Sequence, residues 1–338
     1  MVSTAICKIL VTGGSGLVGS AIKEATLSCH ALFGRDENEE WVFVASSHGD
    51  LRNYEAARSL FEIHKPTKVV HLAARVGGAY ENSLKPASFL LDNLAIDGNI
   101  SRLCHEFKVQ KLVFCLSTCI FPDKTSYPIN KSMLHDGPPH DSNFGYAYAK
   151  QMLDCSNRAY LNQHGCNYTA VIPTNIYGPN DNFSKGCHFV PAIIQRIAQA
   201  RDAGADSIII PGSGSALRQF ISSHDLAKLI IWVLKNYNTP TPIILSVDES
   251  DEIMIKEVVQ QVCKLSGFQG TVEWDTSQTD GQLKKTADNS RMKEHIGEFS
   301  FTPLEIGLAE TLAWYDGNRH LVRDGLTKSE IRGHRKGE

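Results

Sequence analysis

The sequence lacks the features that mark membrane and secreted proteins. No run of about 18 apolar residues occurs, so it predicts no membrane-spanning helix. The N-terminus runs directly into a strand-like segment, with neither a basic leader nor a small-residue cleavage site. We therefore expect a cytoplasmic protein that has no contact with a membrane.

Signals for metal and nucleic acid are also missing. The nine cysteines show no CxxC or zinc-ligand spacing, and the thirteen histidines show no HExxH pattern, so we predict no metal site. The odd number of scattered cysteines indicates reduced thiols rather than a disulfide framework. A net charge of -3 offers no basic surface to a nucleic acid.

Short apolar runs typical of buried strands alternate with helix-length amphipathic stretches over the first half of the chain. These runs lie at 7–11, 41–45, 68–72, 111–116 and 168–172. The alternation predicts an α/β fold, a Rossmann-like doubly wound parallel sheet with a smaller C-terminal substrate-binding part. We expect a cofactor domain over 1–176 with later elements interleaved, a substrate-binding part over 177–320 and a charged tail over 321–338.

A glycine-rich turn follows the first expected strand. Glycines at this place permit a tight turn, close approach of a pyrophosphate and close packing of the next helix, whose N-terminus attracts phosphate. A merely structural glycine turn is the alternative, but the position between strand and helix favours dinucleotide binding. The expected cofactor-binding residues here are Gly13, Gly14, Ser15, Gly16, Leu17, Val18 and Gly19.

The end of the second expected strand bears on which dinucleotide is bound. An acidic residue that would bind the ribose 2′-hydroxyl of NAD is absent, and the strand ends in Ser46 and Ser47. A 2′-phosphate is accepted where a carboxylate would repel it, so the sequence favours NADP. Arg52 or Arg35 could pair with that phosphate, although either could also be an ordinary surface charge.

A Tyr-x-x-x-Lys motif and a serine at a strand end supply acid–base groups. Tyr146 and Lys150 are four positions apart, which places both side chains on one face of a helix, and Ser117 follows the fourth strand-like run. The lysine ammonium is expected to favour the phenolate and so lower the pKa of the tyrosine. Tyr148 is a competing tyrosine that would point elsewhere.

Taken together, the glycine turn, the serine and the Tyr-x-x-x-Lys pair resemble the extended short-chain dehydrogenase/reductase family. Four further segments carry a narrower resemblance: Ser117-Thr-Cys-Ile-Phe-Pro122, Pro173-Thr-Asn-Ile-Tyr-Gly-Pro-Asn-Asp-Asn-Phe183, His188-Phe-Val-Pro191 and Arg218-Gln-Phe-Ile221. They are similar to one group within the family, the NADPH-dependent bifunctional epimerase/reductases that make GDP-L-fucose from GDP-4-keto-6-deoxy-D-mannose. The resemblance runs from about residue 7 to about residue 316.

The resemblance implies roles for individual residues. Cys119 would be the base and His188 the acid that invert carbons 3 and 5 of the sugar. Ser117 would hold the carbonyl oxygen, Tyr146 would give it a proton during reduction of carbon 4, and Lys150 would contact the nicotinamide ribose. Further residues implied to contact NADP(H) are Leu72, Ala73, Ala74, Pro173, Thr174, Asn175, Ile176 and His188.

The substrate-binding residues implied by the resemblance lie in the second half of the chain. Arg196 and Arg218 would bind the pyrophosphate of a GDP-sugar, and Asp280 and Lys285 would close the sugar side, with Lys284 an equal alternative to Lys285. Apolar stripes on the helices expected near 93–107 and 145–163 are what family members use for a homodimer contact, although they could also pack on the sheet.

Two other classes of function can be weighed from the sequence: another nucleotide-sugar enzyme of the same family and a non-catalytic regulator. A 4,6-dehydratase would need an Asp-Glu pair where Cys119-Ile120 follows Thr118, and a 4-epimerase would retain NAD. A non-catalytic NADP-binding regulator would not need the Tyr146–Lys150 pair, which this chain keeps.

Overall fold

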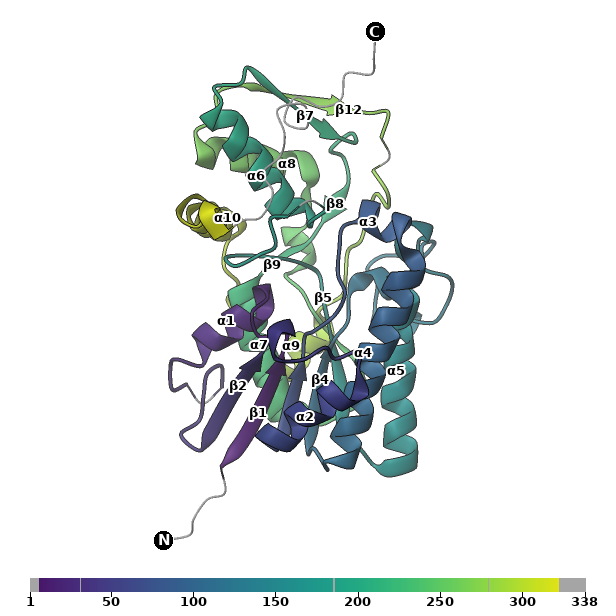
Figure 1. Cartoon of the computed structure of the whole chain (residues 1–338). Helices are drawn as coiled ribbons and strands as arrows, with labels where there is room; N and C mark the ends of the chain where they lie inside the picture. The colour runs from purple at the N-terminus through teal and green to yellow at the C-terminus, as the bar shows by residue number, and fades with distance from the viewer. Residues whose placement is uncertain (1–5, 31, 185, 279, 322–338) are drawn as a thin grey trace.

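A six-stranded parallel sheet forms the centre of the protein in the computed structural model, which describes residues 6–30, 32–184, 186–278 and 280–321 (Figure 1). The expected tail over 321–338 therefore lies, apart from its first residue, outside the described residues. The strand order is β10-β5-β4-β3-β1-β2. The strands are β1 (Cys7–Thr12), β2 (Glu39–Val44), β3 (Lys68–His71), β4 (Lys111–Cys115), β5 (Tyr168–Pro173) and β10 (Ile243–Leu245).

The five expected strands are confirmed, each within a residue or two of its predicted limits. They read as nearly continuous apolar runs because helices cover both faces of the sheet. The chain leaves β1 for β2 on one side and returns to β3 on the other side of β1. This reversal is where an open parallel sheet leaves a crevice outside its carboxyl ends.

Helices pack on the two faces of the sheet and complete two apolar cores. One face carries α2 (Tyr54–His64), α4 (Pro86–Glu106) and α5 (Phe144–His164). The other face carries α1 (Leu17–Ala25), α7 (Ser223–Asn236) and α9 (Ser290–Ile296). The predicted doubly wound architecture is thus confirmed, and its last strand and two of its helices come from beyond residue 176.

A second part with its own core lies against the carboxyl ends of the strands (Figure 1). Its helices are α6 (Phe189–Asp202), α8 (Ile255–Ser266) and α10 (Leu304–Gly317). Its strand pairs are β7 (Ser207–Pro211) with β12 (Thr271–Asp275), and β8 (Leu217–Arg218) with β11 (Ile253–Met254). Strands β6 (Asn175–Tyr177) and β9 (Phe220–Ser222) pair with each other where the chain passes between the two parts.

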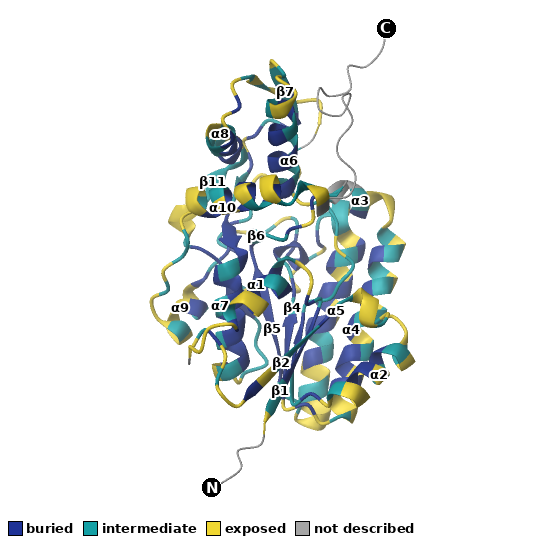
Figure 2. Cartoon of the chain, turned by 60° about the vertical axis from the view of Figure 1, so that its left-hand side comes forward, coloured by how far each residue is buried: buried dark blue, intermediate teal, exposed yellow. Residues whose placement is uncertain are grey.

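Buried residues gather along the central sheet and inside the second part, and exposed residues lie on the outer sides of the helices (Figure 2). The central strands are buried on both sides, whereas α4 and α5 keep apolar side chains on their outer faces. The short helix α3 (Ala79–Leu84) lies at the upper end of α4, beside the second part (Figure 1). Over the residues that are described, every helix is too short or too polar to span a bilayer.

Candidate functional site

The glycine turn between β1 and α1 has the tight geometry that its sequence predicts. Gly13 adopts a φ of 70°, and a Cβ there would lie 2.9 Å from the backbone nitrogen of Ala73. A Cβ on Gly19 would lie 2.7 Å from the Cα of Gly14 and closer still to the carbonyl oxygen of Gly13. Only glycine fits at both positions, so helix α1 begins directly against the turn.

A pocket of about 430 Å³ opens beside this turn. The cation of Lys23 and the imidazole of His48 lie on its wall with the hydroxyls of Ser15 and Ser20, which is a donor set suited to a phosphate. Sequence reasoning named Ser15 but missed Lys23 and His48. Lys23 lies two turns into α1, where only the fold turns it toward the end of β2. The full lining is Gly14, Ser15, Ser20, Lys23, Glu24, Phe43, Ala45, His48 and Asn180.

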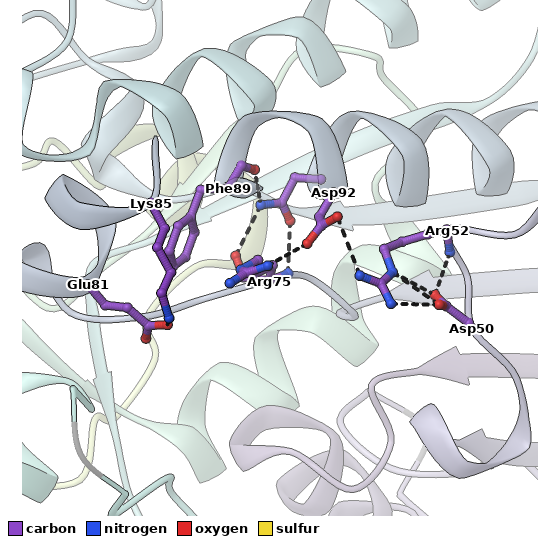
Figure 3. A network of polar contacts seen from close by, with 8 residues as sticks. Asp50, Arg52, Arg75, Glu81, Lys85, Phe89 and Asp92 are labelled. Atoms are coloured by element: carbon purple, nitrogen blue, oxygen red, sulfur yellow. Dashed lines mark hydrogen bonds and ion pairs between the residues drawn. The ribbon is translucent and has the colours of Figure 1, made fainter. Parts of the chain in front are cut away.

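The two arginines proposed from sequence as phosphate partners do not line this pocket. Arg52 is held by Asp50 at 2.7 Å and by Asp92 at 3.4 Å, and Asp92 also pairs with Arg75 at 2.6 Å (Figure 3). Arg35 is exposed. Acidic neighbours therefore occupy the Arg52 guanidinium, which favours the alternative that this arginine is an ordinary surface charge.

The segments after β3 and β5 contain the other residues expected from the sequence to contact the cofactor. The backbone N–H of Leu72 donates to the carbonyl oxygen of Thr12 at 3.2 Å, so the predicted 72–74 segment borders Gly13. From Pro173 the chain leaves β5 for β6, and the side chain of Asn175 donates to the carbonyl oxygen of Gln219 at 2.8 Å. The predicted 173–176 segment thus forms the passage to the second part.

Ser117 and Cys119 lie together at the end of β4. The hydroxyl of Ser117 accepts the backbone N–H of Cys119 at 3.4 Å and caps a 3-10 helix over Thr118–Ile120. Cys119 is 8% exposed. Burial raises the pKa of its thiol, while the ammonium of Lys285 and the neighbouring hydroxyl of Ser117 act in the opposite direction. The thiol is therefore protonated at rest and has a cation beside it that favours the thiolate.

Tyr146 and Lys150 share one face of α5, as their spacing predicts, whereas the competing Tyr148 is 42% exposed. The expected direction of the Tyr146 pKa was wrong. Burial raises it well above the usual range, and the nearby ionisable groups of Cys119, Cys115 and Asp97 act in the same direction. Lys150 has an ionised carboxylate, that of Asp97, 3.2 Å from its ammonium, which offsets its effect on the phenol.

The predicted residues of the second part fall into two groups. Lys285 lies near Cys119 and Arg218, whereas Lys284 points to Glu252 at 3.8 Å, so the structure favours Lys285 over the alternative left open by the sequence. The Arg218 guanidinium donates to the carbonyl oxygens of Leu217 and Gln282 at 2.7 and 2.6 Å.

Of the remaining three candidates, Asp280 and Arg196 bind neighbouring backbone groups, whereas His188 stands at a helix start. Asp280 accepts the backbone N–H and the hydroxyl of Ser213, each at 2.7 Å. Arg196 on α6 donates to the carbonyl oxygen of Ile209. His188 occupies the N-cap position of α6, but its side chain makes no capping hydrogen bond there; it is partly open to solvent, and desolvation of the ring lowers its pKa. No hydrogen bond joins His188 to Cys119 in the described part of the chain.

Comparison with known proteins agrees with this geometry. A model of the NAD dependent epimerase/dehydratase family matches residues 9–247, which contain the glycine turn, Ser117 and the Tyr146–Lys150 pair. The chain belongs to this family. Among curated proteins, the GDP-L-fucose synthase of Dictyostelium discoideum is 47% identical over 316 residues, 93% of this chain and 97% of that protein.

Two further relatives of this epimerase/dehydratase chain extend over nearly its whole length. A probable GDP-L-fucose synthase of Drosophila melanogaster is 46% identical over 94% of this chain and 99% of that protein. A crystal structure of a GDP-L-fucose synthetase from Naegleria fowleri bound to NADP superposes with a TM-score of 0.87. It is 40% identical and covers 96% of this chain and 98% of that one.

Proposed function

We propose that this chain converts GDP-4-keto-6-deoxy-D-mannose to GDP-L-fucose. It inverts carbons 3 and 5 and then reduces the ketone at carbon 4 with NADPH. The observation that carries the proposal is the end of β4, where a serine and a buried thiol lie beside Tyr146. A simple ketoreductase needs the serine and the tyrosine, but it has no use for the thiol.

Epimerisation next to a ketone needs a base on one face of the sugar and an acid on the other. We assign Cys119 as the base and His188 as the acid. The base must lose its resting proton, and the ammonium of Lys285 favours this because it stabilises the thiolate. The hydroxyls of Ser117 and Tyr146 would donate to the enolate oxygen that develops on carbon 4.

Reduction uses the same groups on the carbonyl oxygen. NADPH, when bound, supplies the hydride for carbon 4. Tyr146 gives the oxygen a proton, and burial favours the protonated phenol that this step requires. Ser117 holds the oxygen, and Lys150 would contact the ribose of the cofactor and keep Tyr146 in place.

The residues around the glycine turn fit NADP(H). The turn between Gly13 and Gly19 is tight enough for backbone to approach a pyrophosphate, and the N-terminus of α1 favours its charge. The pocket with Lys23, His48 and Ser15 would take the 2′-phosphate. The 72–74 and 173–176 segments would border the rest of the cofactor.

Substrate recognition is assigned to the second part of the chain. Arg218 and Arg196 would bind the GDP pyrophosphate through their guanidinium groups. Lys285 would face the sugar from beside Cys119. Asp280 would act by holding the 211–214 loop rather than through a free carboxylate, because Ser213 already occupies both of its oxygens.

Incubation with GDP-4-keto-6-deoxy-D-mannose in deuterated water, with and without NADPH, tests this function. We expect deuterium at carbons 3 and 5, which NMR detects, and GDP-L-fucose only when NADPH is added. Cys119→Ser should abolish the incorporation at both carbons. NADPH oxidation without deuterium would leave a simple ketoreductase, and the absence of both signals would favour a non-catalytic NADP-binding regulator.

We also propose a homodimer formed through the outer faces of α4 and α5. Apolar side chains of both helices are exposed there: Leu91 at 63%, Leu94 at 37%, Tyr148 at 42% and Met152 at 52%. Such a surface is unusual for a monomer and suits a second copy of the same helix pair. Detection of only monomer at micromolar concentration would exclude it.

The subcellular localisation and the domain boundaries can also be proposed. We propose a cytoplasmic enzyme, which agrees with nine free cysteines and no disulfide among the described residues. We propose the division into a cofactor domain over 1–176 and a substrate-binding part over 177–320, with β10, α7 and α9 returning to the first. The existence of separate apolar cores supports this division.

A further inference from the structure

A buried chain of hydrogen bonds leads from Lys150 to the glycine turn. The Nζ of Lys150 lies 3.2 and 3.3 Å from the two carboxylate oxygens of Asp97, and Asp97 Oδ1 lies 3.1 Å from Nε2 of His71. The Nδ1 of His71 is 2.6 Å from the hydroxyl oxygen of Thr12, which accepts the backbone N–H of Ala73 at 3.3 Å. Ala73 borders Gly13.

The four side chains are almost inaccessible to solvent and come from four different elements. Their exposures are 2% for Lys150 on α5, 4% for Asp97 on α4, 1% for His71 on β3 and 0% for Thr12 on β1. Buried charges persist in folded proteins when they are paired and hydrogen-bonded. The pairing here joins the proposed catalytic helix to the carboxyl ends of two strands.

The hydrogens can be assigned from the donors and acceptors. Burial lowers the pKa of His71, so its imidazole is neutral and carries one N–H. Burial raises the pKa of Asp97, but the charge of Lys150 and the hydrogen bond from His71 outweigh it, so Asp97 is ionised. His71 then donates from Nε2 to Asp97 and accepts the hydroxyl hydrogen of Thr12 at Nδ1, which leaves every group with a partner.

We propose that Asp97, supported by His71 and Thr12, is the positioning residue of Lys150 in the proposed epimerase/reductase. These hydrogen bonds fix the ammonium of Lys150 relative to the glycine turn, so the distance between the lysine and the proposed cofactor site stays constant. The carboxylate also balances the charge of Lys150 next to Tyr146, so the phenol stays protonated and ready to donate. This inference rests on the proposed function, since Lys150 matters only where Tyr146 acts on a carbonyl.

The central experiment compares Asp97→Asn with Asp92→Asn. Asp97→Asn removes the charge at the centre of the buried hydrogen-bond series with little change of side-chain shape. Asp92→Asn removes an equal charge from the same helix, where the carboxylate pairs with Arg75 and Arg52 and takes no part in that series (Figure 3). We expect kcat for GDP-L-fucose formation to fall about 10- to 100-fold in Asp97→Asn, the range typical when a residue that orients a metal ligand is replaced, because Asp97 orients Lys150 in the same way. The KM for the GDP-sugar should stay within about twofold, because no substrate contact is lost.

Binding of NADPH gives a readout that does not depend on turnover. Quenching of protein fluorescence should show weaker NADPH binding in Asp97→Asn, because Lys150 is no longer held toward the cofactor, and unchanged binding in Asp92→Asn. A role in stability alone would lower the melting temperature and leave kcat and NADPH affinity of the folded fraction unchanged.

A double-mutant cycle shows whether Asp97 acts through Lys150. In a Lys150→Met background, Asp97→Asn should cost no further kcat and no further NADPH affinity. Losses that multiply would overturn the inference. If Asp97→Asn does not fold, Thr12→Val at the other end of the chain gives the same test, with a smaller loss of kcat expected and an unchanged rate counting against the inference.

The outcomes separate the inference from the function on which it rests. Wild-type protein that makes no GDP-L-fucose refutes the proposed function. Active wild-type protein together with an Asp97→Asn variant within about twofold of it in kcat and NADPH affinity refutes the positioning role.

Discussion

Replacement of Gly19 by alanine tests how closely helix α1 must pack on the glycine turn. The added Cβ would lie 2.7 Å from the Cα of Gly14 and 2.8 Å from its carbonyl carbon, where ordinary contacts begin at 3.4 Å. The first turn of α1 must therefore move outward by at least about 0.7 Å to clear Gly14, and further to clear the carbonyl oxygen of Gly13, which is closer still. Both neighbours are backbone atoms, so no side chain can turn aside.

The energetic cost can be bounded. Overpacking of a tightly packed site costs about 1–3 kcal/mol. If all of it opposes cofactor binding, the Kd for NADPH rises about 5- to 150-fold, since 1.4 kcal/mol is a factor of ten. If the free protein carries the strain, the melting temperature falls instead, by roughly 2–4 °C per kcal/mol for a domain of this class.

Titration with NADPH followed by protein fluorescence, together with thermal unfolding, measures both parts. Gly317→Ala is the matched control, because Gly317 is the exposed last residue of α10 and a Cβ there would meet no other atom within 4 Å. Alanine stabilises helices relative to glycine by about 0.5–1 kcal/mol, so the control should melt no lower than wild type and bind NADPH equally well.

The reasoning is refuted by one specific result. If Gly19→Ala binds NADPH as tightly as wild type and melts at the same temperature, the backbone contact around Gly19 is not as close as the structure has it. A loss confined to binding would place the strain in the turn that faces the cofactor.

Three further predictions concern separate parts of the molecule. Because burial raises the pKa of Cys119, deuterium exchange at carbons 3 and 5, followed by NMR, should accelerate from about pH 6 to pH 9. Lys285→Met should slow this exchange. An exchange rate that does not change with pH would contradict the role of the thiol. Burial raises the pKa of Asp181 to about 7 in the folded state, above its value in the unfolded chain. The free energy of unfolding therefore declines as pH rises from the unfolded pKa to the folded pKa. Asp181→Asn should therefore have a higher melting temperature than wild type at pH 8 but not at pH 4. A melting temperature equal to that of wild type at both pH values would contradict the raised pKa of Asp181. Leu91→Glu should give monomers in size-exclusion chromatography with light scattering, whereas Leu27→Glu, at an exposed leucine outside α4 and α5, should not.

Local sequence was sufficient for the sheet and for the turn that follows β1. Strands buried on both faces are recognisable because they contain few polar residues, and the helices between them because their apolar residues are periodic. Gly13 and Gly19 could be interpreted for the same reason, since the backbone demands on a tight strand-to-helix turn are local. Tyr146 and Lys150 share a face of α5 through helical spacing alone.

The spacing of Tyr146 and Lys150 could not give the ionisation of the phenol. From sequence the nearby lysine was expected to lower the pKa of Tyr146, yet burial raises it, and Asp97, 53 positions away from Lys150, balances the lysine charge. Burial and distant partners are properties of packing. No pattern within the segment that contains the motif records them.

Several partnerships depended entirely on the tertiary structure. Lys284 and Lys285 are adjacent in sequence, but only Lys285 comes near Cys119. The sequence left open whether Arg52 meets a phosphate, and only the tertiary structure shows its pairing with Asp50 and Asp92. The sequence by itself determined the fold class and the cofactor turn, because strand and helix patterns and a tight turn depend on neighbours within a few residues, whereas the roles proposed for Cys119 and His188 came from the resemblance to a known family. The tertiary structure decided which charges meet and how deeply they are buried, because those depend on segments that only folding brings together.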